Sequence, residues 1–136
     1  MRRLAAAFTG AILLAGPAWA ESPGADLLAT LDQLMFARAV SDRCGHPDSR
    51  TADSFQHRYA AALDRAEAAM KALSSDLTVP HIKKLMNDHY GEIDRRSSVM
   101  ITQESCNGPH IQQALQKYDG VANSADTQPA IDGDNQ

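Results

Sequence analysis

The segment DRCGHPD (residues 42–48) is echoed by ESCNGPH (residues 104–110), and these two segments contain the only cysteines of the chain, Cys44 and Cys106. Each cysteine is accompanied by a glycine, a proline and a histidine. Glycine is frequent just after the last turn of a helix, and proline often follows because it cannot continue one. We therefore expect each segment to be a connection in which one helix ends and the next begins.

The spacing of apolar residues on either side of these connections predicts four helices. Their expected ranges are 22 to about 43, about 51 to 73, 79 to about 104 and 109 to about 120. Capping residues support three of the starts: Ser22 precedes Pro23, Thr78 precedes a proline-containing first turn, and Pro109 opens the last helix. No run alternates apolar and polar residues strongly enough to indicate a strand. The predicted fold is all-α, a small antiparallel bundle of about four helices.

The order of the helices predicts a disulfide. In an up-down-up-down bundle the first and third helices run in the same direction, so their C-terminal ends lie at the same end of the molecule. Cys44 is expected at the end of the first helix and Cys106 just after the third. In an oxidising compartment, two cysteines placed in this way are expected to form a crosslink.

Two alternatives would use His46 and His110, which lie beside the cysteines in the sequence. The first is a Cys2His2 zinc site, but the usual ligand pairs of the Cys-x2-4-Cys and His-x3-5-His type are absent from the sequence. The second is a catalytic Cys–His pair, which would need a reduced thiol and a third, orienting group that is not evident. We therefore predict the Cys44–Cys106 disulfide and no metal at this end.

The two ends of the chain suggest a targeting segment and a tail. Residues 1–20 have two arginines, a short apolar run and a final Ala-Trp-Ala, which is typical of a secretory signal peptide. Their apolar run is shorter than the roughly 20 residues that span a bilayer, and no membrane anchor is expected. Residues 21–122 are predicted to form the helical domain, and residues 123–136 a disordered acidic tail. The expected location is the periplasm.

The charge balance argues against nucleic acid as a partner. Without Arg2 and Arg3 of the predicted signal, 11 of the 13 basic residues remain against 17 acidic ones, a formal charge of −6. Affinity for nucleic acid comes mainly from lysine and arginine side chains that neutralise phosphates. The sequence lacks a basic cluster dense enough to offset this balance.

The first predicted helix is apolar on two sides. At about 100° per residue, Leu31 and Leu34 lie on one face, whereas Phe36 and Val40 fall on nearly the opposite face. A helix with two apolar faces is either central in its bundle or covered by another molecule. One interpretation is that the fourth helix or the tail covers the second face. The other, which we adopt as the prediction, is that Phe36 and Val40 form a surface for a protein partner or a second copy of the chain.

His89 is the one histidine that follows an apolar stripe, three residues after Met86. The structural interpretation is a packed histidine whose ring nitrogen binds a carbonyl group or water. The functional interpretation pairs His89 with Met35, which the bundle geometry places in the same layer. A histidine and a methionine facing each other in a four-helix bundle resemble the axial ligands of a periplasmic b-type cytochrome of the b562 kind. That resemblance would imply a haem carrier, although no cofactor is predicted.

The function predicted from these features is a non-enzymatic, secreted binding module, such as an envelope accessory factor, an inhibitor or an immunity-type protein. No paired carboxylates, nucleophile motif or phosphate-binding loop is evident in the sequence. The alternative is a periplasmic carrier of a small ligand, a metal or haem that uses His89, Met86 and Met35. The sequence does not identify the partner or the oligomeric state.

Overall fold

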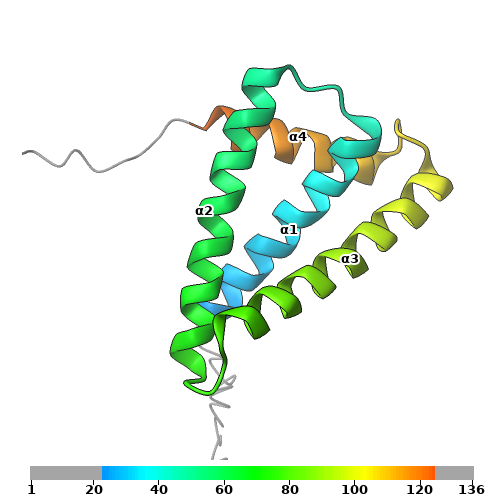
Figure 1. The fold of residues 1–136 in the computed structure, drawn as a ribbon. Coiled ribbons are helices and arrows are strands. Elements are labelled where there is room, and N and C mark those ends of the chain that lie inside the picture. The colour runs from blue at the N-terminus through cyan, green and yellow to red at the C-terminus, as the bar shows by residue number, and fades with distance from the viewer. Residues whose placement is uncertain (1–22, 125–136) are drawn as a thin grey trace, which may run out of the picture.

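The structure is a computed structural model in which residues 23–124 can be described, and within this part of the chain all regular structure is helical. The elements are α1 (Pro23–Cys44), α2 (Ser49–Leu73), α3 (Val79–Glu104) and α4 (Pro109–Asn123). Short connections join them (Figure 1). The prediction of an all-α bundle is therefore confirmed for the described residues. The predicted signal peptide (1–20) lies outside them, as does the predicted tail apart from residues 123 and 124.

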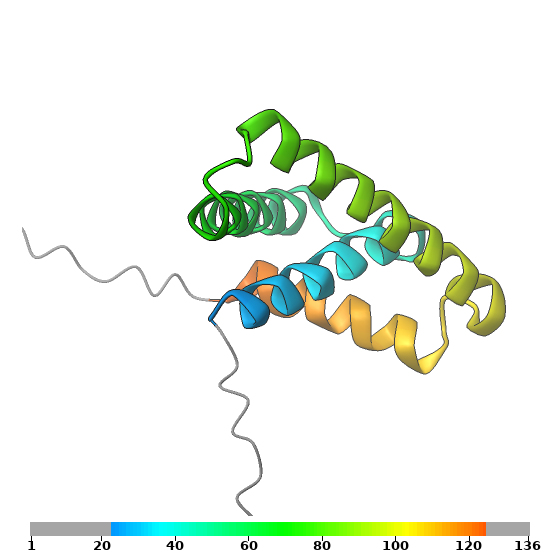
Figure 2. The same cartoon turned by 90° about the horizontal axis from the view of Figure 1, so that it is seen from below.

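Helix α1 is the centre of the bundle, because its contacts with the other three helices are the most extensive in the described fold. Figures 1 and 2 show α3 running in nearly the same direction as α1, whereas α4 returns beside α1 in roughly the opposite direction. Residues 34–41 of α1 include no exposed position. The two apolar faces of this helix are thus explained by neighbours within the same chain.

The helix starts follow from local capping chemistry. The Asp48 side chain accepts a hydrogen bond from the backbone N–H of Thr51 at 2.8 Å, so α2 begins two residues before the predicted start at Thr51. Thr78 caps α3 in the same way through the N–H of His81, as predicted. The last helix was expected to end at about residue 120, and α4 continues to Asn123.

The core consists of two packed clusters. In the larger cluster the ring of Phe55 stacks on that of Tyr118, with centroids 3.9 Å apart, and Met35 is almost fully buried nearby at 1% exposure. In the smaller cluster Val40 packs with Ile111 and Ala114 of α4. Both clusters include residues of α1, so the packing of each cluster depends on this helix.

The cysteine-containing connections meet at one end of the bundle. The sulfur atoms of Cys44 and Cys106 lie 1.96 Å apart, a disulfide distance, and their Cα atoms are 5.4 Å apart. This pair joins the end of α1 to the connection between α3 and α4, as the order of the helices predicted. With each sulfur bonded to the other, neither cysteine is a free thiolate for zinc or for catalysis.

The glycines in these connections are needed for close approach. A Cβ atom on Gly45 would lie 2.6 Å from Oγ of Ser41, and one on Gly108 would lie 2.7 Å from a carboxylate oxygen of Glu104. Neither glycine has a positive φ; among non-glycine residues of the described chain, Ser105 alone does, with φ of 64°. Close packing, and not a left-handed backbone conformation, therefore accounts for both glycines.

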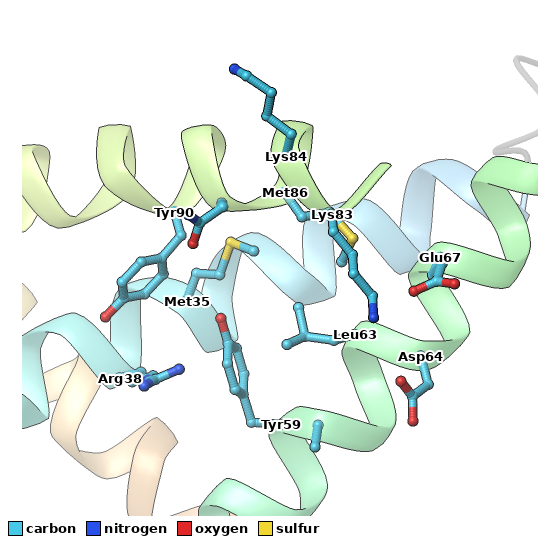
Figure 3. A pocket seen from close by; sticks show the side chains of 12 residues that line it. Met35, Arg38, Tyr59, Leu63, Asp64, Glu67, Lys83, Lys84, Met86 and Tyr90 are labelled. Atoms are coloured by element: carbon cyan, nitrogen blue, oxygen red, sulfur yellow. The ribbon is translucent and has the colours of Figure 1, made fainter. Parts of the chain in front are cut away.

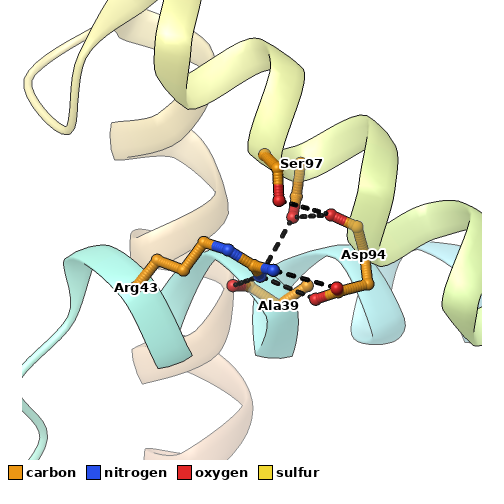
Figure 4. Close-up of polar contacts among 5 residues, drawn as sticks. Ala39, Arg43, Asp94 and Ser97 are labelled. Carbon is orange, nitrogen blue, oxygen red and sulfur yellow. Dashed lines mark hydrogen bonds and ion pairs between the residues drawn. The ribbon is translucent and has the colours of Figure 1, made fainter.

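A polar contact joins α1 to α3 near the disulfide (Figure 4). The guanidinium of Arg43 donates to both carboxylate oxygens of Asp94, at 2.6 and 2.9 Å, and also to the carbonyl oxygen of Ala39 at 3.1 Å. This pairing holds the pKa of Asp94 below its usual value of 3.8. Fork-shaped arginine–carboxylate pairs fix geometry as well as charge, so the contact helps to set the position of α3 along α1.

Among the helices that the structure describes, none combines the length and the apolar character needed to cross a membrane.

Candidate functional site

The candidate ligand site beside the central helix is a groove of about 750 Å³ between α2 and α3, with α1 as its floor (Figure 3). We name it the α1–α2–α3 groove. It is lined by two residues of α1, five of α2 and five of α3. These residues are Met35, Arg38, Tyr59, Ala60, Leu63, Asp64, Glu67, Lys83, Lys84, Met86, Asn87 and Tyr90.

Helical periodicity explains how the two walls form. Four of the five lining residues of α3 recur at positions 83, 86, 87 and 90, and those of α2 recur at positions 59, 60, 63, 64 and 67. Each set falls on one face of its helix, because residues three and four apart lie together. The bottom of the groove is apolar, with buried Met35 and partly buried Leu63 and Met86.

Arg38 is the cation at the bottom of this groove, and Figure 3 shows it between the rings of Tyr59 and Tyr90. Its guanidinium carbon lies 5.0 Å from the centroid of the Tyr59 ring and 5.3 Å from that of Tyr90. Both distances are within the range of cation–π attraction. Burial raises the pKa of both tyrosines, and the charge of Arg38 opposes this shift. The hydroxyl groups therefore stay neutral at physiological pH.

The rims of the groove carry charges of both signs. Asp64 and Glu67 lie on the α2 side, and Lys83 extends from α3 towards them in Figure 3. Within the described residues no ion pair of 4.0 Å or less joins Lys83 to either acid. Lys84 differs, because its ammonium group pairs with Asp88 at 2.6 Å and lies at the outer edge.

The structure separates the residues of the predicted carrier site. Met35 and Met86 both line the α1–α2–α3 groove, but His89 does not. The His89 side chain is 48% exposed, and its Nε2 atom lies 2.6 Å from a carboxylate oxygen of Asp32. The predicted packing of His89 in the core is therefore wrong, and its ring does not face Met35 across the bundle in the way an axial ligand pair would.

The structure also contradicts the predicted partner surface at Phe36 and Val40. Val40 is fully buried against Ile111 and Ala114, because α4 lies over this face of α1. Phe36 is partly buried and packs against both core clusters. Its remaining exposed surface lines a smaller groove of about 460 Å³ between α1, α3 and α4. Val40 therefore cannot contact a partner in this fold.

The two histidines beside the cysteines do not assemble a metal site. The Nδ1 atom of His110 lies 2.5 Å from a carboxylate oxygen of Glu104, and its side chain is 63% exposed. His46 is exposed in the connection after α1. Over residues 23–124, no three or more His, Cys, Asp or Glu side chains come together in a way that could hold a metal ion.

Arg38 is the residue of the groove that the sequence analysis missed. It stands inside the stretch 34–41, where every other residue is apolar or small. A charged side chain in a segment that is apolar on two sides is an unusual feature, and it could have drawn attention to this position. Tyr59 and Tyr90 lie within two of the predicted helices, but their meeting around one arginine depends on the packing of three helices.

No protein-family model matches the chain, and no curated protein or solved structure is significantly similar to it.

Proposed function

We propose that this chain is a non-enzymatic, exported binding protein that receives a segment of another protein in the α1–α2–α3 groove. The observation that carries the proposal is the groove itself, with its apolar floor between two charged rims. Pockets for small molecules usually enclose most of the ligand surface. This groove is partly open to solvent, as are sites where an amphipathic helix or an extended segment is laid into a cleft.

Export is part of the same proposal and has separate support. A disulfide pair is stable in an oxidising compartment and is rare in the cytosol. The N-terminal sequence has the arrangement of a signal peptide. Periplasmic fractionation, with mass-spectrometric identification of the mature N-terminus at Glu21, would test this part.

The test of binding uses a photo-crosslinking amino acid at Asn87, an exposed position on the α3 wall. A second substitution, Ala60→Trp, fills the groove from an exposed position on the α2 wall. The matched control is Ala61→Trp, because Ala61 is also exposed but lines a different groove between α1, α2 and α4.

We expect one protein to crosslink to the Asn87 position in the cells that make this chain. Ala60→Trp should reduce the adduct at least tenfold, and Ala61→Trp should leave it unchanged. Both variants should keep the melting temperature of the parent, because neither removes a buried contact. Absence of any adduct, or equal adducts in both tryptophan variants, would contradict the proposed binding site.

The alternative function is a carrier of a small ligand, and one observation favours it: two methionines line the same groove. Methionine side chains are adaptable and contact many apolar shapes. Metal analysis and a visible absorption spectrum of the exported protein would test the carrier function. A stoichiometric metal or a haem band that disappears in Met86→Leu would support the carrier and contradict the crosslinking prediction.

A further inference from the structure

We propose that Arg38 recognises a carboxylate side chain on the partner segment, so that the α1–α2–α3 groove selects acidic residues flanked by apolar ones. This assignment rests on the proposed function of the groove. It adds the chemistry of the partner, which the shape of the groove alone does not give.

The first support is the way Arg38 is held. The rings of Tyr59 and Tyr90 flank its guanidinium carbon at 5.0 and 5.3 Å. Both tyrosines are at most partly exposed, and Tyr59 is only 2% exposed, so the rings are held by the core. A guanidinium between two rings keeps its N–H edges available, and these edges match the two oxygens of a carboxylate. The site is thus arranged before a ligand arrives.

The second support is that Arg38 lacks an acidic partner among the described residues. None of the ion pairs between described residues includes Arg38. Asp42, one turn further along α1, is exposed and makes no ion pair with Arg38. Arg43, the residue after Asp42, shows the contrast, because it holds Asp94 with two hydrogen bonds. A partly buried cation gains most from a charged hydrogen-bond partner where water is scarce. Arg38 also interacts with the hydroxyl group of Tyr59, and this interaction opposes the rise that burial causes in the pKa of that tyrosine.

The third support distinguishes a polypeptide from a lipid-like anion. A fatty acid would offer one negative charge and an apolar tail. The groove has acids on the α2 rim, Asp64 and Glu67, and a lysine on the α3 rim, Lys83. Charges of both signs at the rims with apolar side chains below fit a segment that carries both acidic and basic residues. The carboxylate source that we infer is therefore an aspartate or glutamate of a partner protein.

The test begins with a display library of random 16-residue peptides selected on the oxidised, full-length exported protein. Affinities of the enriched peptides are then measured by fluorescence anisotropy for the parent and for Arg38→Gln. Lys71→Gln is the matched control, because Lys71 is an exposed cation of α2 outside the groove. Melting curves are recorded for both variants. Arg38→Lys is a further variant at this position, which keeps the positive charge but lacks the forked guanidinium group.

We expect the enriched peptides to contain an acidic residue between apolar residues. Replacing that residue by its amide should weaken binding about tenfold or more, and Arg38→Gln should do the same, as is typical of hydrogen bonds to charged groups. The two changes together should weaken binding little more than either alone, because both remove the same contact. Lys71→Gln should have no effect.

Three other outcomes are informative. Peptides that lose binding in Ala60→Trp, and so bind in the groove, but show no preference for acidic residues would overturn the role of Arg38. They would leave the proposed function standing. No groove-dependent peptide at all would overturn both. Arg38-dependent binding of dodecanoate, measured by displacement of an environment-sensitive dye, without any peptide binding would overturn the choice of a polypeptide partner.

Discussion

Replacing both cysteines by serine measures how much the Cys44–Cys106 bond contributes to the free energy of unfolding. The bonded residues are 62 positions apart. In the chain-entropy model, a loop of this length lowers the entropy of the unfolded state enough to stabilise the fold by about 4 kcal/mol. The total stability of a domain of this size is roughly 5–15 kcal/mol. We therefore expect the double variant to remain folded at room temperature with a much smaller margin.

The corresponding change in melting temperature can be worked out from the size of the domain. About 100 described residues give an unfolding entropy of roughly 0.2 kcal/mol/K, so 4 kcal/mol corresponds to about 20 °C. Circular dichroism melts of the oxidised parent and of Cys44→Ser/Cys106→Ser measure this difference. Alkylation and mass spectrometry of the unreduced parent serve as the control and should find no free thiol. Two free thiols, or a difference below about 5 °C, would refute the reasoning.

Three further predictions concern single positions. Val40→Asp places an unpaired charge in a fully buried site, so we expect urea unfolding to show a free energy of unfolding lower by roughly 3–5 kcal/mol or more. The control Val99→Asp, at a half-exposed position of α3, should lower it by no more than about 0.5 kcal/mol. Because pairing with Arg43 lowers the pKa of Asp94, the pair stabilises the fold above the unfolded pKa of about 3.9, and this stabilisation is lost as the pH falls through the lower folded value. Melting curves between pH 7 and pH 2 should show the difference in melting temperature between the parent and Asp94→Asn closing in acid. A difference that stays constant would contradict this prediction. Gly108→Ala should lower the melting temperature, because its Cβ atom would lie 2.9 Å from the backbone oxygen of Glu104, and an unchanged melt would show that this connection can shift.

The parts of the fold that could be predicted from the sequence are those fixed by neighbouring residues. Thr78 and Pro109 mark helix starts because a cap and a first-turn proline act within a few residues of each other. Asp48 was missed because an aspartate directly after a proline was assigned to the connection instead of to the cap. The pairing of Cys44 with Cys106 was predictable because only the direction of the helices had to be known.

The parts that could not be predicted depend on which faces meet. The two apolar sides of α1 indicated a covered helix, but periodicity alone could not show whether α4 or a partner protein covers the second side. The prediction that Val40 faces a partner was wrong. His89 lies about 60° round the helix from Met86, on the side away from Tyr90. That difference is enough to place it at the edge of the apolar stripe, where Asp32 reaches it. The site around Arg38 depends on how α1, α2 and α3 are aligned with one another, and the sequence of no single helix determines this alignment.

The absence of exposed positions between residues 34 and 41 has a consequence for how this protein can change over time. On α2, α3 and α4, each turn has a solvent face where most side chains are tolerated, so neutral substitutions can accumulate there. In this stretch of α1 every side chain is bounded by its neighbours, and a change in volume at one site must be matched by a change on another helix. Phe36 and Arg38 are its partly exposed members, and each opens into a groove. Descendants of this chain that acquire new partners are therefore expected to vary the rims of those grooves while the stretch beneath them stays nearly constant.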